Sequence, residues 1–424
     1  MIWLYRALLA ALLPVAVPAL AISDRVAGKR RPEWVDRLLR RPPAMTAGGL
    51  WLHAVSVGEV EIARRLVAEI AKAPIELPIV VTATTATGLD LARRTMGDEL
   101  TVLPSPLDLP GPVGRLLDAA RPREIAVVET ELWPEMLHQA GRRGIPAAVI
   151  NARLSDASYR RYRRVRWLLG PLLEPIRLVL ARSDADAERF TALGVPPDAV
   201  RVTGNIKYDL EIDATPLPWA DDLRAAAGSR PILVAGSTME GEEAVLLDTV
   251  ARLTAAGRRP MLVLAPRHPE RFDPVADLVT RSGLAMTRRS FDEPPSAGTT
   301  VFLLDTIGEL ARAYGLATVA FVGGSLVSTG GHNPLEPAVW GVPVLSGRHV
   351  ANFDEVYREM VGAGAAVLVD DVDELTAAAT AWIDDPAAAR AAGESGRTVV
   401  EANRGATGRT VAALFELAAQ GPQG

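Results

Sequence analysis

The sequence of 424 residues contains no cysteine and only five histidines. The absence of cysteine excludes disulfide bonds, thiolate zinc sites and cysteine nucleophiles, and it fits a reducing compartment. The histidines are spread widely along the chain, which argues against a histidine metal cluster. The net charge of −5 is small for this length, so the chain as a whole does not attract nucleic acid. The length itself indicates two domains of roughly 200 residues each.

An uncharged apolar run extends from Ala7 to Ile22 and is followed by a basic cluster. The run is somewhat shorter than the roughly 18 to 20 residues of a spanning helix, and two prolines would kink it. A cleaved signal peptide is therefore an alternative, with Arg6 as its basic end and Ala19-Leu20-Ala21 as its cleavage site. The charge balance favours a retained membrane anchor, residues 1–24, with the downstream chain on the cytoplasmic side. The basic cluster consists of Arg25, Lys29, Arg30, Arg31, Arg37, Arg40 and Arg41.

From Leu50 onward, short β-branched runs alternate with amphipathic stretches, which predicts an α/β fold with parallel sheets covered by helices on both faces. The alternation breaks near residue 209 and restarts at Ile232. We therefore expect a Rossmann-like N-terminal domain at 25–208, a linker at 209–230 and a Rossmann-like C-terminal domain at 231–424, whose last helix can pack back on the N-terminal domain. Two such doubly wound domains are expected to face a cleft, with ligands beyond the carboxyl ends of the strands. The predicted strands are 50–55, 79–83, 125–129, 147–150, 178–181, 232–235, 261–265, 301–304, 319–322, 342–345 and 366–369.

Acidic residues follow two predicted strands of the first domain. In His53-Ala-Val-Ser-Val-Gly-Glu59, Glu59 can act as the general base that takes the proton of a sugar hydroxyl, or it can merely favour the positive end of a helix dipole. In Glu129-Thr-Glu131-Leu-Trp-Pro134, two acids at the mouth of a sheet are costly to desolvate, which favours a role. Alternatively, Thr130 caps the following helix and Glu131 stays solvated.

Cations follow two further strand segments of this domain. Asn151-Ala-Arg-Leu-Ser155 supplies Arg153, and Gly204-Asn-Ile-Lys207 supplies Lys207. Both suit an anionic donor, and Lys207 can stabilise a carboxylate or a departing phosphate, although a surface salt bridge is the alternative. Asp184-Ala-Asp186 matches a metal-binding pattern of other sugar transferases, but the preceding Ser183 predicts a helix cap there instead.

In the second domain, polar and glycine-rich motifs again follow predicted strands. Arg267 comes after strand 261–265 and can clasp a phosphate or a pyrimidine edge. Three glycine-containing motifs follow, in which glycines permit close backbone approach and helix N-termini offer N–H groups to a phosphate. Turns also use glycine routinely, so each motif alone is weak and the ordered set is stronger. The motifs are Asp305-Thr-Ile-Gly-Glu309, Gly323-Gly-Ser325 and Gly330-Gly-His-Asn-Pro-Leu-Glu336.

Together these segments resemble the Kdo transferases, the 3-deoxy-D-manno-octulosonic acid transferases of lipid A biosynthesis. The matches occur in family order and cover nearly the whole chain. The resemblance implies a GT-B architecture, with acceptor binding in the N-terminal domain and CMP binding mainly in the C-terminal one. The matching stretches are His53 to Glu59, Glu129 to Pro134, Asn151 to Ser155, Gly204 to Lys207, Ala235 to Thr238, Pro266 to Phe272, Asp305 to Leu310 and Phe321 to Pro337.

The resemblance also implies an activity and its site. The expected reaction is inverting transfer of Kdo from CMP-Kdo to a lipid A precursor at the cytoplasmic face of a bacterial inner membrane, without a metal or another cofactor. By similarity, Glu59 is the base that deprotonates the acceptor hydroxyl, while Glu129 and Lys207 assist the transition state. The residues implied to hold CMP are Pro266, Arg267, Ile307, Gly308, Glu309, Asn333, Pro334, Leu335 and Glu336.

Three positions depart from the family pattern. Met239 stands where the family often has His, Ile307 where it often has Met, and Arg348-His349 where Gly-Pro is common. Two other functional classes also fit the domain pattern. A nucleotide-sugar epimerase uses two such domains but is usually soluble, so the anchor and the basic cluster favour a lipid acceptor. The second class is a non-catalytic nucleotide-sugar binding protein, which would not need Glu59, Glu129 and Lys207 together.

Overall fold

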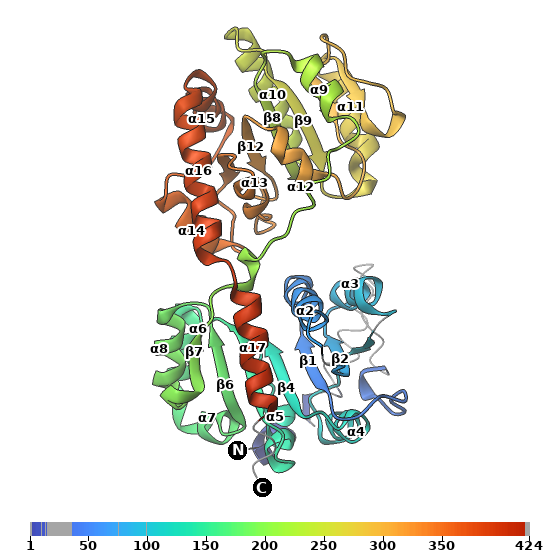
Figure 1. The fold of residues 1–424 in the computed structure, drawn as a ribbon, viewed down its shortest axis with the longest axis vertical. Coiled ribbons are helices and arrows are strands. Elements are labelled where there is room, and N and C mark those ends of the chain that lie inside the picture. The colour runs from blue at the N-terminus through green and yellow to red at the C-terminus, as the bar shows by residue number, and fades with distance from the viewer. Residues whose placement is uncertain are drawn as a thin grey trace. The chain divides into compact units, whose positions relative to one another are not determined.

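The computed structural model describes residues 2–9, 11–12, 14, 36–74, 76–98 and 100–419. The chain forms two units: Met1–Asp209 with Arg404–Gly424, and Leu210–Asn403 (Figure 1). Each unit contains a seven-stranded sheet in which every strand pair is parallel. The predicted pair of parallel α/β domains is therefore confirmed.

The sheet of the first unit has the order β3-β2-β1-β4-β5-β6-β7. Its strands are β1 (Leu50–Ala54), β2 (Ile79–Ala83), β3 (Thr101–Pro104), β4 (Glu124–Val128), β5 (Ala147–Ala152), β6 (Ile176–Ala181) and β7 (Val200–Val202). Its helices are η1 (Asp36–Leu38), α2 (Val57–Ile70), α3 (Ala86–Met96), α4 (Pro110–Ala120), α5 (Pro134–Arg142), α6 (Asp156–Arg164), α7 (Arg166–Leu173), α8 (Asp184–Leu193), η2 (Pro197–Ala199), η3 (Ile206–Tyr208) and α17 (Ala406–Ala419).

The sheet of the second unit has the order β10-β11-β9-β8-β12-β13-β14. Its strands are β8 (Ile232–Thr238), β9 (Met261–Pro266), β10 (Met286–Arg288), β11 (Val301–Leu303), β12 (Val319–Val322), β13 (Val344–Gly347) and β14 (Ala366–Val369). Its helices are α9 (Ala220–Ala227), α10 (Glu242–Ala255), η4 (Pro269–Arg271), α11 (Phe272–Arg281), η5 (Arg289–Phe291), α12 (Leu310–Ala313), η6 (Tyr314–Leu316), α13 (Leu335–Val339), α14 (Asp354–Gly362), α15 (Val372–Asp384) and α16 (Pro386–Asn403).

The strand order reverses direction at β1/β4 in the first sheet and at β8/β12 in the second. At such a point the two following helices cover opposite faces of the sheet, which leaves a crevice at the carboxyl ends of the strands. The strands at these points are mostly apolar and almost wholly buried, since both faces carry helices. The reversal points therefore determine where a ligand site is expected in each unit.

The last helix belongs to the first unit. On α17, the apolar side chains of Val411, Leu414 and Leu417 share one core cluster with β1 and α2. Asp209 fixes the start of this segment, since its carboxylate accepts hydrogen bonds from the backbone N–H groups of Gly405 at 2.6 Å and Thr407 at 2.5 Å. Figure 1 shows α17, in red, among the blue and green elements of this unit.

The structure adds elements that periodicity did not predict. The short strands β3, β7 and β10 lie at sheet edges, where few residues carry an apolar pattern. Residues 209–230, expected as a linker, contain α9, and Trp219 packs on Phe302 with 4.9 Å between ring centroids. Most of the expected anchor, residues 1–24, lies outside the described residues. Among the described ones, no helix is long and apolar enough to cross a membrane.

Candidate active site

Glu59 lies in the first turn of α2, directly after the carboxyl end of β1. One of its carboxylate oxygens accepts a hydrogen bond from the backbone N–H of Val55 at 2.7 Å, and the other accepts one from the Ser56 hydroxyl at 3.0 Å. The side chain thus stabilises the start of the helix, which is the alternative role that the sequence left open. Its residue exposure is only 7%.

The protonation of Glu59 is set by its surroundings. Burial raises the pKa of this carboxyl to about 7, and the nearby charges of Glu129 and Glu131 act in the same direction. The hydrogen bonds from Val55 and Ser56 oppose the rise, because they favour the ionised form. A carboxyl with a pKa near neutral pH suits a general base, which must both ionise and accept a proton. The position and the pKa are therefore compatible with the predicted role.

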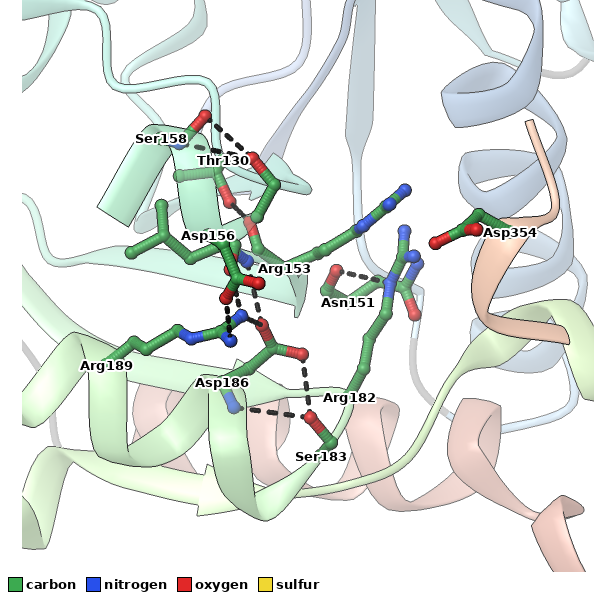
Figure 2. A network of polar contacts seen from close by, with 12 residues as sticks. Thr130, Asn151, Arg153, Asp156, Ser158, Arg182, Ser183, Asp186, Arg189 and Asp354 are labelled. Atoms are coloured by element: carbon green, nitrogen blue, oxygen red, sulfur yellow. Dashed lines mark hydrogen bonds and ion pairs between the residues drawn. The ribbon is translucent and has the colours of Figure 1, made fainter. Parts of the chain in front are cut away.

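Glu129 follows β4 and is paired with a residue that the sequence reasoning missed. Its carboxylate accepts a hydrogen bond from Arg182, whose side chain is only 2% exposed. Arg182 also donates to the backbone carbonyl of Asn151 at 3.1 Å, so it joins the ends of β4 and β5 (Figure 2). Both Glu129 and Asn151 have positive φ angles, 60° and 50°, a strained conformation often found at functional sites. The one signal in the sequence is a charged residue directly after the apolar strand β6.

Lys207 lies on η3 and is positioned through its backbone. The Asn151 side chain accepts a hydrogen bond from the N–H of Ile206 at 3.0 Å. Arg65, on α2, donates to the carbonyl of Ile206 at 2.9 Å and to that of Lys207 at 3.0 Å. The elements that carry Glu59, Glu129 and Lys207 are therefore linked by specific hydrogen bonds within the first unit. Their predicted catalytic roles remain predictions.

A cavity of about 460 Å³ lies beside the Glu129-to-Pro134 motif. Thr130 does not cap α5, so that alternative is wrong: its hydroxyl donates to the carbonyl of Arg153, while Asp108 accepts from the N–H groups of Glu135 and Met136, each at 2.9 Å. The cavity is lined by Tyr5, Thr130, Glu131, Leu132, Trp133, Pro134, Arg153, Leu154, Ser158, Arg161 and Tyr162.

His53 is buried behind this motif and has a structural role. Burial, with a smaller effect from the Arg37 charge, lowers the pKa of His53 to about 3, so the imidazole is neutral at physiological pH. Its Nδ1 is 2.8 Å from the hydroxyl of Thr82, and its ring makes an edge contact with Trp133 at 5.8 Å between centroids. His53 thereby supports a wall of the cavity.

Asp184 and Asp186 form a helix start. Ser183 caps α8 by accepting a hydrogen bond from the N–H of Asp186, which confirms the predicted cap. The Asp186 carboxylate also accepts from the Leu154 N–H at 2.8 Å and from the Ser183 hydroxyl at 2.8 Å (Figure 2). Over the described ranges, no three His, Asp or Glu side chains are grouped so that they could hold a metal ion.

In the second unit, the predicted CMP residues follow β9, β11 and β12. Arg267 is exposed at the end of β9, and Ile307 presents an apolar side chain that is 70% exposed. Glu309 is buried: its carboxylate accepts from the Trp219 indole N–H at 3.1 Å and from the Thr306 hydroxyl, and it forms an ion pair with Arg289 at 3.2 Å. The protein therefore holds this buried carboxylate firmly, two residues after the exposed Ile307.

The loop after β12 is organised by Glu242, another residue that the sequence reasoning missed. Its buried carboxylate accepts hydrogen bonds from the N–H groups of Gly324, Ser325 and Leu326 at 2.7 to 2.9 Å. These N–H groups are thus already bonded within the protein. Met239 also donates its backbone N–H to Glu242 at 2.8 Å, a bond that does not depend on the side chain at this position. The only sequence signal is an acid at the start of a helix.

The run from Asn333 to Glu336 begins α13, and the Asn333 side chain accepts a hydrogen bond from the Leu335 N–H at 3.1 Å. Burial, aided by the charges of Arg267 and His268, lowers the pKa of the neighbouring His332 to about 4. This effect requires that the loop and Arg267 lie close together. Two of the predicted CMP motifs therefore lie close together in the fold.

Comparisons with known proteins identify the family. A family model described as 3-deoxy-D-manno-octulosonic-acid transferase (kdotransferase) matches residues 29–210. A 3-deoxy-D-manno-octulosonic acid transferase of Haemophilus influenzae is 37% identical over 417 residues, which cover 96% of this chain and 97% of that protein. The chain belongs to the Kdo transferase family. This finding confirms the resemblance seen in the motifs, and this Kdo transferase is accordingly a glycosyltransferase.

Two further comparisons separate similarity of sequence from similarity of fold. The Kdo transferase of Bordetella pertussis is 36% identical over 383 residues, 88% of each chain. A solved structure of the UDP-GlcNAc 2-epimerase of Neisseria meningitidis covers 88% of this chain and 100% of its own, with a TM-score of 0.55 and 14% identity. At that identity it shows a shared fold alone. The fold thus hosts both transfer and epimerisation, and the Kdo transferase family is assigned by sequence.

Proposed function

We propose that this Kdo transferase moves Kdo from CMP-Kdo to a lipid A precursor, similar to lipid IVA, in lipopolysaccharide biosynthesis, with inversion at the anomeric carbon. The observation that carries the proposal is the position of Glu59 at the reversal point of the first sheet, with a pKa raised to about 7. Family membership supports the sugar.

In the proposed reaction, the acceptor hydroxyl oxygen attacks the anomeric carbon of Kdo while its proton passes to the Glu59 carboxylate. The bond from that carbon to the phosphate oxygen breaks, and its electron pair leaves with CMP. A single displacement of this kind inverts the configuration. Lys207 neutralises negative charge on the sugar carboxylate or the departing phosphate. Glu129, held by Arg182, keeps a negative charge near Glu59 and so favours uptake of the proton.

The donor is proposed to bind the second unit. Arg267 provides a cation for the monophosphate, and the exposed side chain of Ile307 provides an apolar wall for the base. Glu309 accepts hydrogen bonds from the ribose, together with Glu336 in the run that starts at Asn333. Pro266, Gly308, Pro334 and Leu335 complete the proposed CMP set, in which Gly308 has a φ of 93° that favours glycine.

We also propose that the protein is anchored at the inner membrane with both units on the cytoplasmic side. The apolar run from Ala7 to Ile22 and the basic cluster after it support this orientation. Protease treatment of sealed inverted vesicles tests it: the two units should be digested from the outside. Protection of both units would reject the orientation.

The function is tested by mass analysis of the lipid after the detergent-solubilised protein reacts with CMP-Kdo and lipid IVA. The expected product is the acceptor plus one or more Kdo units, with one CMP released for each. Glu59→Gln should abolish transfer and leave CMP binding nearly unchanged, because donor and base are assigned to different units. Undiminished transfer by this variant would remove Glu59 from the mechanism. Conversion of the donor without a lipid would instead indicate an epimerase.

A further inference from the structure

The stretch of chain before β8 reaches the proposed CMP site through Trp219. This residue stands directly before α9, in the segment that the sequence predicted as a linker. Its indole N–H donates a hydrogen bond to the Glu309 carboxylate at 3.1 Å, and the two residues are 90 positions apart in the chain. Both are buried, with exposures of 6% and 9%. The proposed reaction gives a role to Glu309 and none to Trp219.

The Glu309 carboxylate is held at both of its oxygens. The oxygen that accepts from Trp219 also accepts from the Arg289 guanidinium at 3.4 Å. The other oxygen accepts from the Thr306 hydroxyl and is paired with Arg289 at 3.2 Å. Glu309 precedes α12, but its side chain does not cap that helix, so these contacts fix the carboxylate itself. An ionised carboxylate has about four acceptor positions, and this side chain is still 12% exposed, so a ribose hydroxyl can reach it.

The cation beside Glu309 is fixed in turn. Arg289 lies on η5, and the next residue, Ser290, donates its N–H at 2.8 Å and its hydroxyl at 2.6 Å to the buried Asp305 carboxylate. Arg288 pairs with the same carboxylate at 2.7 Å. Asp305 and Glu309 are the two ends of one predicted motif, so η5 is bonded to both ends. Arg289 therefore offsets the negative charge of Glu309 from a fixed position.

The Trp219 ring has a second contact, which explains its burial without any role in binding. It packs on Phe302 at 4.9 Å between ring centroids. A buried indole N–H also needs an acceptor, but a backbone carbonyl suffices, as for Trp340, which donates to the Ala311 carbonyl at 2.7 Å. Trp219 instead donates to a side chain of the predicted CMP set. A neutral N–H adds no charge to this site, and its effect is directional, because hydrogen bonds weaken when they are misaligned.

We propose that Trp219 is a positioning residue of the CMP site: its indole N–H holds the Glu309 carboxylate in the orientation that accepts a hydrogen bond from the ribose, while Arg289 offsets the charge. The inference rests on the proposed function, because it concerns the nucleotide of the same reaction. A carboxylate that is already fixed loses little side-chain freedom when the ribose binds, so the contribution of Trp219 is to donor affinity. The segment before β8 thereby becomes part of the nucleotide site.

The indole N–H is tested by Trp219→Phe, which removes the hydrogen bond and keeps an aromatic ring on Phe302. CMP titrated into the full-length protein in detergent micelles should bind about tenfold more weakly to this variant. The KM for CMP-Kdo should rise by a similar factor, with kcat and the acceptor KM unchanged. Trp340→Phe is the matched control, because it also loses an indole N–H but should bind CMP like the wild type. Wild-type CMP affinity in Trp219→Phe would overturn the proposal.

CMP analogues distinguish positioning from a general effect on the fold. The wild-type protein should bind 2′-deoxy-CMP or 3′-deoxy-CMP, whichever lacks the contacted hydroxyl, more weakly than CMP. Trp219→Phe should bind that analogue as tightly as the wild type does, because the hydrogen bond that Trp219 supports is then absent from both complexes. An equal loss for CMP and both analogues would show that Trp219 acts on the whole unit, against the proposal. Failure of the wild-type protein to bind CMP would instead reject the proposed function.

Arg289 provides a second test that leaves the indole in place. Arg289→Gln should weaken CMP binding several-fold, because the buried Glu309 carboxylate loses its counter-ion and the contacts on that side. Arg289→Lys keeps the charge and should restore part of the affinity. Arg258→Gln, which breaks a pair with Asp384 elsewhere in the second unit, should leave CMP binding unchanged. CMP affinity equal to wild type in Arg289→Gln would contradict the role given to this charge.

Discussion

Glu59 uses both carboxylate oxygens to hold the start of α2, and it is also the residue proposed to take a proton. The two roles are compatible because the pKa of the carboxyl is about 7. Burial and two neighbouring acids raise this pKa, while two hydrogen bonds lower it because they favour the charged form. The hydrogen bonds fix the geometry, and the burial sets the basicity.

The pH dependence of transfer follows from this balance. Since Glu59 must be ionised to act as a base and its pKa is about 7, kcat should rise with pH through that value and then level off. Glu131→Gln removes a charge that raises the pKa of Glu59, so the acid limb should move to lower pH. The measurement is kcat against pH with both substrates saturating. Glu61→Gln, on the exposed side of α2, is the control, and an acid limb that stays in place in Glu131→Gln would contradict the argument.

A second buried acid affects stability. Glu124, at the start of β4, is 1% exposed, and burial raises its pKa to about 7. Between its ordinary pKa near 4.5 and about 7, the folded protein binds more protons than the unfolded chain, so folding stability falls as pH rises through this window. The Glu124→Gln variant has no carboxyl at this position, so it does not lose stability in this way as the pH rises. The free energy of unfolding of the variant, relative to wild type, should increase by on the order of 1–3 kcal/mol from pH 5 to pH 8.

Urea titrations at the two pH values measure this difference directly. Glu59 has the same type of shift in both proteins, so its contribution cancels in the comparison. An equal difference at pH 5 and pH 8 would show that folding does not raise the pKa of Glu124.

At the scale of single elements, the sequence predicts the central strands well because parallel strands buried on both faces are continuous β-branched runs. β2, β12 and β14 have the predicted bounds. The motifs at the strand ends are also visible, since polar residues there interrupt an apolar pattern. The sequence does not reveal which distant residues form hydrogen bonds with these strand-end motifs. Arg182 and Glu242 meet Glu129 and Gly324 only after folding, and no local pattern links residues so far apart in the chain.

Glu242 offers a test of such a partner. Glu242→Gln replaces one acceptor oxygen with an amide donor, which would face backbone N–H groups of the loop from Gly324 to Leu326. Loss of these bonds should lower the stability of the second unit by about 2–3 kcal/mol and weaken CMP binding, because the loop leads into the run from Asn333 to Glu336.

Thermal unfolding and CMP titration measure both effects. Glu240→Gln is the matched control, because the Glu240 side chain is exposed and near Arg271 only at 3.5 Å. Stability equal to wild type in Glu242→Gln would mean that the loop does not depend on this carboxylate.

At the scale of the whole molecule, the first unit depends on a segment from beyond the second. Leu414, on α17, is buried in the core that includes β1 and α2. Leu414→Ala should therefore lower the stability of the first unit by about 2–5 kcal/mol, as expected for a buried leucine. Glu416→Gln, which alters only an exposed pair with Arg201, should change it by less than about 0.5 kcal/mol. Calorimetry of both variants measures these changes. A similar loss of stability in the two variants would contradict the assignment of α17 to the core of the first unit.

The position of α17 also determines when the enzyme can finish folding. During translation the residues of the first sheet leave the ribosome before those of the second unit, while α17 leaves after both. The apolar groove that α17 covers must therefore stay open on the nascent chain until nearly all of the protein has been made. An interrupted synthesis yields a first half that lacks its final helix, so chaperones have a defined surface to protect and quality-control proteases have one to detect.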